Sequence, residues 1–436
     1  MHGFAYQNGV LHCEDVNLEQ LAADHGTPLY VYSANTIRGH VQRLRDALAP
    51  LDHKIAFAVK ANSNLAVLNL LANFGTGFDI VSGGELFRVL KAGGSASDCS
   101  FAGVGKTRDE IRYALKQGIH CFNAESEAEV VAINEVAGSL GLSAPVALRV
   151  NPNVDAKTHK YISTGKQENK FGIDFDHIEA AYERAADLPH IRLRGLQMHI
   201  GSQLTSVQPF VEAVAKVAPL AERLRDRFGI EFFSIGGGIG IIYHDTLASG
   251  AEDWWRAGDH DQPPLTLDTY AAEIVPLLQP LGLKIILEPG RLITGNAGVL
   301  LTRVLYHKAG SARNFMIIDA GMNDLIRPAL YEGHHDIVPV SQDDAAGTTP
   351  DDPREVFDVV GPICETGDFL AQDRPLPRVP EGGLLAVLSA GAYGFVMASN
   401  YNSRPLPAEV LVDAGVARLV RRRQTLDDLI AGESIL

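Results

Sequence analysis

The chain has 436 residues, which is enough for two domains that each bury a core of their own. Apolar residues make up 46% and charged residues 21%, the balance of an ordinary globular protein. The formal net charge of −15 argues against a nucleic-acid partner, because such proteins need basic faces. There is no apolar run of about 18 residues and no signal-peptide pattern at the start, so we expect no membrane partner and a cytoplasmic location.

The cysteines and histidines do not indicate a metal site. The four cysteines are Cys13, Cys99, Cys121 and Cys364. They lie far apart and form no CxxC pair, which predicts neither a zinc site nor a disulfide framework. His334 and His335 are adjacent, but no further ligands follow at a suitable spacing, so a loop is the better interpretation.

The first elements in the chain are two strand-like runs, 9–16 and 28–33, and a helix predicted over 36–49. Eight short apolar runs then alternate with amphipathic stretches. The runs are 54–62, 77–82, 100–105, 119–126, 145–152, 193–202, 231–238 and 283–291, with 100–105 the weakest. The helical stretches are 64–75, 83–94, 108–118, 127–141, 177–188, 207–228 and 269–282. Three of them open with a capping box, Ser82 to Glu85, Thr107 to Glu110 and Ser126 to Glu129.

Eight strands alternating with helices over about 240 residues predict a (β/α)₈ barrel. An open, doubly wound sheet is the alternative, because alternation alone cannot close a barrel. After residue 296 the pattern changes to strand-like runs separated by turns, at 299–310, 314–321, 336–340, 354–364, 383–394 and 408–415. We therefore predict a barrel domain over 34–296 and a β-rich domain of 1–33 plus 297–436. Two stretches, 244–264 and 341–353, are predicted surface loops.

The active site of such a barrel lies at the carboxyl ends of its strands. The first strand ends in Lys60, which is either a side chain reaching solvent or a nucleophilic amine. Asp79 ends the second strand and could be a turn residue, and His199 near the end of the sixth could be an ordinary core histidine. The seventh strand ends in a glycine cluster, 236–240, which suits a tight turn or a phosphate.

The eighth strand is followed by Glu288 and Arg291, which could form a structural ion pair or bind ligand groups. Taken together, these strand ends offer an amine, a phosphate cradle, an aromatic ring and a carboxylate. A pyridoxal phosphate site requires that set of groups. Their joint occurrence is much less probable by chance than any single motif.

Several motifs resemble the fold-type III pyridoxal-phosphate decarboxylases, in the same order and over nearly the whole chain. They are AFAVKAN around Lys60, HIGSQ at 199–203, GGGIG at 236–240, EPGR at 288–291, GPICETGD at 361–368 and GAYG at 391–394. HIGSQ, RPALYEGHH at 327–335 and YNSRP at 401–405 are more similar to the members that act on diaminopimelate than to those that act on ornithine or arginine. The resemblance implies an alanine racemase-like barrel with a β-rich domain, decarboxylation of meso-2,6-diaminopimelate to L-lysine and CO₂, and a place as the last step of lysine biosynthesis.

The resemblance also implies residue roles. Lys60 holds pyridoxal 5′-phosphate covalently, with Asp79 nearby; His199 stacks on its ring and Glu288 pairs with the ring nitrogen. The residues that contact the phosphate or another part of the cofactor are Ser202, Gly237, Gly238, Gly290, Arg291 and Tyr393. The substrate is bound by Arg291, Arg327, Tyr331, Glu365 and Tyr393, and Cys364 donates a proton. Family members are homodimers in which Cys364 and Glu365 complete the partner's site, and we expect the same here.

The stretch 243–265, with Trp254 and Trp255, is longer and more acidic than the family pattern, which leaves its role open. The alternatives to diaminopimelate are ornithine, arginine or carboxynorspermidine, and Arg327 discriminates because such substrates lack a distal carboxylate. A non-catalytic protein that binds the cofactor would not need Cys364 and Tyr393. A racemase is disfavoured because Glu288 strengthens the ring as an electron sink.

Overall fold

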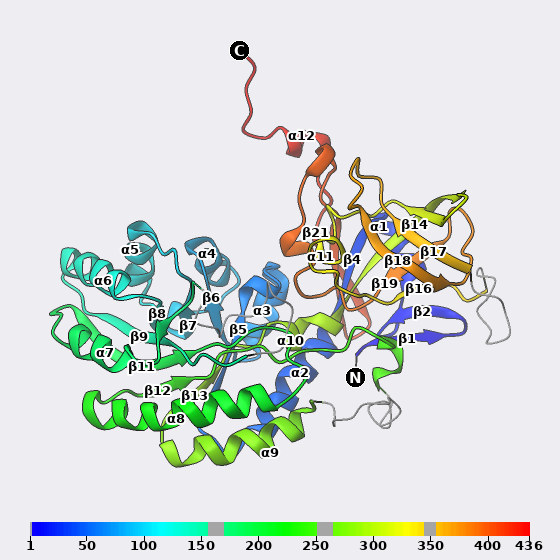
Figure 1. Cartoon of the computed structure of the whole chain (residues 1–436). Coiled ribbons are helices and arrows are strands. Elements are labelled where there is room, and N and C mark those ends of the chain that lie inside the picture. Colours follow the sequence, from blue (N-terminus) through cyan, green and yellow to red (C-terminus); the bar gives the residue numbers. More distant parts are fainter. Residues whose placement is uncertain (1, 156–169, 251–264, 344–354) are drawn as a thin grey trace. The chain divides into compact units, whose positions relative to one another are not determined.

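The computed structural model describes residues 2–155, 170–250, 265–343 and 355–436 (Figure 1). The chain forms two compact units. One comprises 1–37, 241–258 and 294–436, and the other comprises 38–240 and 259–293. Trp254 and Trp255, and most of the two expected loops, lie outside the described residues.

The second unit is a closed barrel of eight parallel strands among the described residues. The strands are β5 (His53–Ala58), β6 (Gly77–Ile80), β7 (Cys99–Phe101), β8 (Cys121–Ala124), β9 (Ala144–Asn151), β11 (Ile191–Met198), β12 (Phe232–Ser234) and β13 (Lys284–Leu287). Each strand pairs with the next along the chain, and β13 pairs with β5 to close the ring. A short strand, β10 (Ile173–Asp174), extends the edge of β9. The barrel prediction is confirmed. The open sheet is excluded because in it β5 and β13 would not pair with each other.

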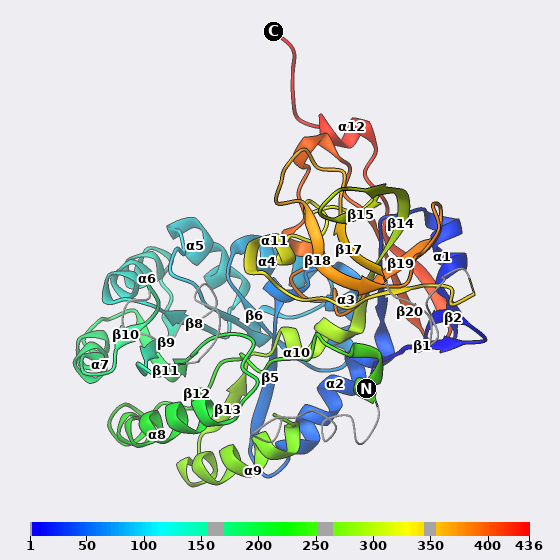
Figure 2. The same cartoon turned by 45° about the vertical axis from the view of Figure 1, so that its right-hand side comes forward.

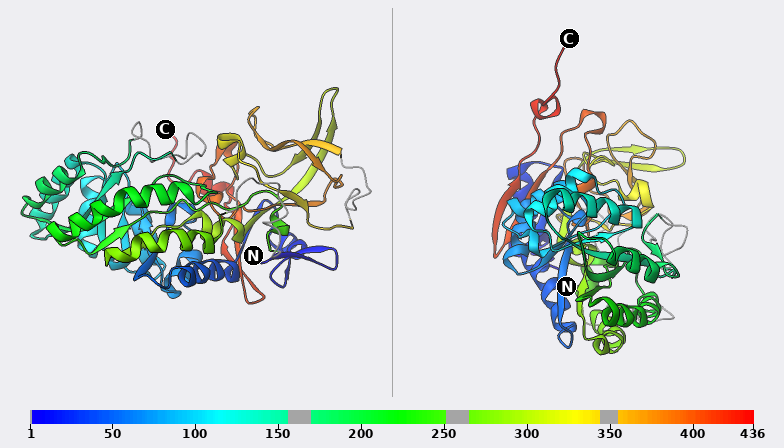
Figure 3. Two further views of the ribbon diagram at one scale, coloured as in Figure 1. Left: turned by 60° about the horizontal axis from the view of Figure 1, so that its bottom comes forward. Right: turned by 90° about the vertical axis from the view of Figure 1, so that its left-hand side faces the viewer.

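Helices cover the outside of this ring (Figure 2). They are α2 (Ala34–Ala47), α3 (Leu65–Asn73), α4 (Gly83–Lys91), α5 (Arg108–Gln117), α6 (Glu127–Leu140), α7 (Ile178–Ala186), α8 (Gln208–Phe228) and α9 (Leu267–Leu278). In Figure 3, α8 (green) and α9 (yellow-green) run side by side. Inside the ring pack the side chains of Ala56, Cys121, Ala147, Phe232 and Ile286. Gly195 makes room for Phe232, whose ring would lie 2.4 Å from any Cβ at that position.

The three predicted capping boxes differ in their second hydrogen bond. Thr107 and Glu110 form the complete box, in which each side chain bonds the other residue's backbone. Ser82 and Ser126 cap their helices as predicted, accepting from the backbone of the residue three positions on. Glu85, however, accepts from the N–H of Val81, the residue before the cap, and Glu129 does the same with Glu125. The prediction was wrong on this detail, because a long Glu side chain reaches the N–H at either position.

The first unit is built on a mixed β-sheet. Its strands and helices are β1 (Phe4–Gln7), β2 (Val10–Cys13), β3 (Val16–Asn17), α1 (Leu18–His25), β4 (Leu29–Ser33), β14 (Gly298–Ala309), β15 (Asn314–Ile318), α11 (Arg327–Tyr331), β16 (Ile337–Pro339), β17 (Glu355–Val360), β18 (Phe369–Leu376), β19 (Leu384–Val387), β20 (Ala408–Asp413), β21 (Val416–Arg421) and α12 (Leu426–Leu429). The short helix α10 (Arg291–Thr294) begins in the barrel unit, which ends at residue 293. The main sheet has the order β18-β17-β15-β14-β4-β20-β21. Strand β4, from the beginning of the chain, therefore lies between two strands from the C-terminal half.

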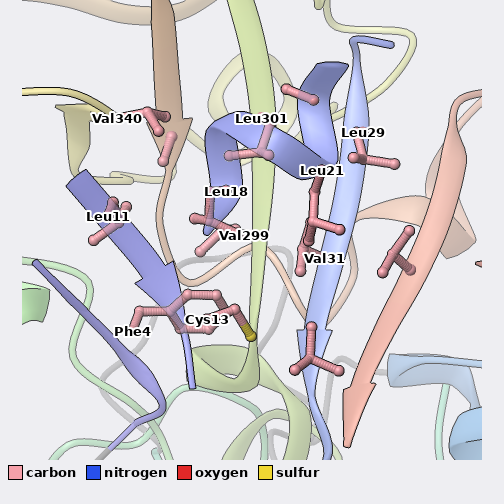
Figure 4. Close-up of a cluster of buried hydrophobic side chains, with 14 of the residues drawn as sticks. Phe4, Leu11, Cys13, Leu18, Leu21, Leu29, Val31, Val299, Leu301 and Val340 are labelled. Atoms are coloured by element: carbon pink, nitrogen blue, oxygen red, sulfur yellow. The ribbon is translucent and has the colours of Figure 1, made fainter. Parts of the chain in front are cut away.

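Two strands of this sheet were not predicted. β18 contains charged residues and a proline, and β21 is an edge strand whose side chains are largely exposed, so neither shows the apolar alternation of a core strand. The core of the unit gathers Leu11 of β2, Leu18 of α1, Val31 of β4, and Val299 and Leu301 of β14 (Figure 4). No helix among the described residues is long and apolar enough to cross a membrane.

Candidate active site

The amine of Lys60 and the carboxylate of Asp79 meet at neighbouring strand ends of the barrel. Lys60 lies in the single turn Val59–Ala61 that follows β5, and Asp79 lies within β6. Nζ is 3.2 Å from Oδ2, and the Lys60 side chain is 40% exposed while that of Asp79 is only 1% exposed. The other carboxylate oxygen, Oδ1, is buried and has no hydrogen-bond partner among the residues described. The aspartate therefore fixes the amine and still has an unsatisfied acceptor.

Glu288 follows β13 and is buried to 6% exposure. The Ser234 hydroxyl donates to Oε1 at 2.7 Å, and the Gln197 amide donates to Oε2 at 3.0 Å. Asn123 contributes a longer contact to Oε1 at 3.4 Å. Burial raises the pKa of Glu288 above its ordinary value, and the negative charge of Asp79 raises it further. Neutral donors thus hold a carboxylate whose charge a cationic group would stabilise.

Sequence reasoning missed Asn123, Gln197 and Ser234. Each is a polar residue inside an apolar strand, on β8, β11 and β12. A buried polar side chain needs a hydrogen-bond partner, and here the shared partner is Glu288. The polar residue within each of these three apolar runs was the signal in the sequence that could have indicated them as site residues.

His199 comes directly after β11. Its Nδ1 accepts a hydrogen bond from the N–H of Gly237 at 3.3 Å, which leaves the proton of the neutral ring on Nε2. Burial lowers the pKa of His199 well below its ordinary value, and the charges of Arg149 and Lys60 lower it further. The imidazole is therefore a neutral, oriented ring, suited to packing flat against another ring.

A buried ion pair that the sequence did not suggest supports this histidine. Arg149 on β9 and Glu125 after β8 are 2.9 Å apart, and both side chains are almost fully buried. Arg149 also donates to the backbone carbonyl of His199 at 3.4 Å. Glu125 accepts from the N–H groups of Gly103 at 3.2 Å and Gly172 at 2.9 Å. The pair connects several strand ends around the site.

The glycine loop after β12 packs directly on its neighbours. A Cβ at Gly237 would lie 2.1 Å from the carbonyl oxygen of Glu288, and one at Gly238 would lie 2.4 Å from that of Gly201. Gly238 also has a φ of +106°, which disfavours any other residue. Only glycine permits this close approach of the backbone.

Ser202 and Arg291 meet beside this loop. The Arg291 guanidinium donates to the Ser202 hydroxyl at 3.1 Å, and Arg291 is 7% exposed. Gly290 lies against the first strand end, where an added Cβ would meet the Cβ of Ala61 at 2.8 Å. A hydroxyl, a guanidinium and closely packed backbone are groups that can bind an oxyanion.

The remaining predicted site residues belong to the β-rich unit. Arg327 begins α11 and Tyr331 ends it. Cys364 is exposed, and its N–H donates to the Asn402 side chain at 2.7 Å. The neighbouring Glu365 is also exposed, and Tyr393 has a left-handed backbone with φ of +56°. His334 contacts the Asp336 carboxylate at 2.9 Å, and the described residues contain no cluster of three metal-ligating side chains.

The barrel and its site define the class of protein. The family model for the pyridoxal-dependent decarboxylases, pyridoxal binding domain, matches residues 34–295. The chain belongs to the family of pyridoxal-dependent decarboxylases. Within it, the chain is similar to the diaminopimelate decarboxylase of Pseudomonas aeruginosa, at 52% identity over 100% of both chains.

Solved structures give the same relationship. Diaminopimelate decarboxylase from Helicobacter pylori, complexed with L-lysine, is 40% identical with a TM-score of 0.86, and the match covers 95% of this chain and 98% of that one. The enzyme from M. jannaschii, in co-complex with L-lysine, is 35% identical with a TM-score of 0.89. The match covers 100% of this chain and 99% of that one.

Proposed function

We propose that this protein decarboxylates meso-2,6-diaminopimelate to L-lysine and CO₂, the last step of lysine biosynthesis, with pyridoxal 5′-phosphate as cofactor. The main support for this proposal is the 52% identity, over the full length of both chains, with the diaminopimelate decarboxylase of Pseudomonas aeruginosa. The barrel site supports it, because an amine, a buried carboxylate and an oxyanion cradle lie at the strand ends where such a site is expected.

The residues present fit the cofactor. Among the described residues, one buried oxygen of Asp79 has no hydrogen-bond partner, and neutral donors hold Glu288. A positively charged ring nitrogen would stabilise the negative charge of these buried carboxylates. Lys60 would hold the cofactor covalently, with Glu288 at the ring nitrogen and His199 against the ring. The phosphate would be bound by Ser202, Gly237, Gly238, Gly290, Arg291 and Tyr393. When bound, the cofactor supplies a ring that accepts the electron pair released as CO₂ departs.

The protein's own residues would then bind the substrate and move one proton. Arg327 offers a guanidinium for the carboxylate at the far end, and Glu365 a carboxylate for the ammonium group there. Arg291, Tyr331 and Tyr393 would line the remainder. The Cys364 thiol, exposed in this chain, would deliver its proton to the carbon that has lost CO₂.

The assembly is part of the same proposal. We propose a cytoplasmic homodimer in which Cys364 and Glu365 complete the partner's site. Residues 34–296 would serve as the cofactor-binding domain, and 1–33 with 297–436 would form the β-rich domain. The exposure of Cys364 and Glu365 supports a role at a surface that another chain covers.

The test supplies meso-diaminopimelate, its LL isomer, ornithine and arginine separately to the purified protein with pyridoxal phosphate, and measures CO₂ and L-lysine. We expect turnover of meso-diaminopimelate with L-lysine as product. Release of CO₂ from ornithine or arginine, without L-lysine from diaminopimelate, would show that the substrate is a different basic amino acid.

A further inference from the structure

Two side chains hold the guanidinium of Arg327: the Tyr243 ring packs against its flat face, and His335 bonds one of its edges. Its carbon lies 4.4 Å above the centre of the Tyr243 ring. Its Nη1 is 2.5 Å from Nε2 of His335. Arg327 is 6% exposed and His335 is fully buried. Two different contacts thus fix the plane of a buried cation.

The hydrogen bonds of His335 define how it holds Arg327. Its Nδ1 is 2.7 Å from the carbonyl oxygen of Leu388, which can only accept, so Nδ1 carries the proton. Nε2 of the neutral ring then has a lone pair for the Arg327 N–H. The His335 ring also meets the Tyr243 ring edge to face, with 5.1 Å between centroids. The three side chains form one packed group, which we call the arginine clamp: Tyr243, Arg327 and His335.

The segment that carries Tyr243 is itself fixed within the same unit. The backbone N–H of Thr246 donates to the Asp336 carboxylate at 2.7 Å, and His2 bonds the carbonyl of Thr246 at 2.6 Å. The next ring, His244, stacks on His334 with 3.7 Å between centroids. Tyr243 therefore lies on an anchored stretch of chain, and its ring can act as a fixed platform.

We propose that Tyr243 and His335 are positioning residues that orient Arg327, and so set the preference for a substrate with a carboxylate at its far end. A guanidinium binds a carboxylate through two parallel N–H groups only when its plane is correctly directed. Stacking on one face and a hydrogen bond on one edge prevent the plane from rotating. The inference deepens the proposed function and rests on its assignment of Arg327 to the distal carboxylate.

The test compares two ligands that differ only in this carboxylate. L-lysine carries it, and 1,5-diaminopentane lacks it. Binding of each to the holoenzyme is measured by calorimetry for the wild type, Tyr243→Leu and His335→Asn. The asparagine can still donate to Leu388 but offers Arg327 no acceptor where Nε2 was. We expect L-lysine to bind roughly tenfold more weakly in both variants, the effect of weakening a hydrogen bond to a charged group.

Binding of 1,5-diaminopentane should remain unchanged in these variants. Tyr243→Phe keeps the ring and His335→Gln keeps an acceptor, so both should retain most of the preference for L-lysine. Tyr306→Leu is the matched control, since Tyr306 is 62% exposed on β14. In steady-state assays with diaminopimelate, KM should rise in Tyr243→Leu and His335→Asn more than kcat falls.

The outcomes separate this inference from the proposed function. If the wild type turns over diaminopimelate but both variants keep its preference for L-lysine, the clamp has no role in selectivity. Equal weakening of both ligands would indicate general damage to the site and also overturn the inference. If the wild type prefers L-lysine and the variants lose that preference, the inference about the clamp is supported. That result stands even if diaminopimelate is not turned over and the proposed function is wrong.

Discussion

Lys60, Asp79 and Glu288 determine the charge balance of the barrel site. One amine lies 3.2 Å from a buried aspartate, and a second buried carboxylate is held by uncharged donors. Two carboxylates near one amine leave the site short of positive charge. A cofactor with a protonated ring nitrogen would correct that deficit, which is why we place Glu288 at that nitrogen.

Replacing Lys60 with alanine should abolish covalent attachment of the cofactor. No other lysine of the described barrel residues is placed at Asp79, so the visible absorption band of the lysine-bound cofactor should disappear, together with activity. Spectra of the wild type and of Lys54→Ala, whose lysine bonds Asp98 instead, provide the comparison. A visible band that persists in Lys60→Ala would mean that a different amine is the attachment point.

Replacing Glu288 with glutamine should stabilise the cofactor-free protein at alkaline pH. The folded-state pKa of Glu288 is raised, so the folded protein favours the protonated acid, and it loses stability as pH rises from the ordinary carboxyl range through the raised value. Glutamine removes this titration, and Gln197, whose amide oxygen has no partner among the described residues, can turn to accept from it.

Urea unfolding at two pH values tests the Glu288 prediction. We expect the glutamine variant to be more stable than the wild type by about 1–3 kcal/mol at pH 8, and by much less at pH 5. Pyridoxal phosphate should reverse the order at pH 8, because it restores a partner to the wild-type carboxylate. A variant that is less stable at both pH values without cofactor would contradict the assignment.

The connections after the strands, more than the strands themselves, build the site. Lys60 lies in a single turn after β5, and the glycine loop follows β12. Backbone hydrogen bonds tie that loop down, since Leu204 donates to the carbonyl of Gly238 at 2.9 Å and Gly240 donates to that of Leu204 at 2.8 Å. A loop held this closely can present its backbone to a phosphate without reorganising.

Replacing Gly238 with alanine should damage this loop. The new Cβ would meet the Gly201 carbonyl at 2.4 Å, and the φ of +106° would be strained for alanine. We expect the apparent Kd for pyridoxal phosphate to rise by at least tenfold and stability to fall by about 1–3 kcal/mol. Gly105→Ala is the control, because nothing lies within 4 Å of its Cβ position. Fluorescence titration and thermal melts measure both effects, and equal behaviour of the two variants would refute the role of the loop.

The β-rich unit depends on β4, a strand from the beginning of the chain. β4 is buried along its full length and pairs antiparallel with β14 and parallel with β20. The middle of this sheet is therefore completed by residues that come before the barrel in the chain. Folding of that unit requires contacts between segments that are far apart in the chain, such as Leu29 with Ala408.

A chain that starts at residue 34 should therefore fail to fold its β-rich unit, although the barrel sequence is intact. β14 and β20 would each lose the partner on one side and expose an apolar edge, which favours aggregation. Limited proteolysis and size-exclusion chromatography test this. Removal of 431–436, an exposed tail, is the control and should leave the elution and the protease pattern unchanged. A soluble, protease-resistant shortened chain would show that β4 is dispensable.

Mixing two inactive variants should restore activity if the site is shared between protomers. Lys60→Ala and Cys364→Ala each lack one essential group. Mixed dimers would contain one site with both groups intact, so random exchange should recover about one quarter of the wild-type activity. Activity after mild unfolding and refolding of the mixture is compared with that of each variant treated alone. Mixed dimers that form without any activity would show that each chain builds its own site.

The sequence by itself determined the alternation of strands and helices and the chemistry at most strand ends. Lys60, Glu288 and the glycine cluster at 236–240 could be predicted because each ends or follows an apolar run, and a local pattern is enough to place them. The strands β18 and β21 were missed because edge strands lack that pattern.

Tertiary structure alone decided which polar residues within the strands face one another. Gln197 lies 91 positions from Glu288 in the chain, and Ser234 lies 54 positions away, yet both bond its carboxylate. The same holds for Arg149 with Glu125, and for Tyr243 with Arg327 and His335. Periodicity reports how a residue faces within its own element, whereas barrel closure and sheet order determine which distant residue it meets, and those depend on long-range pairing that no local pattern encodes.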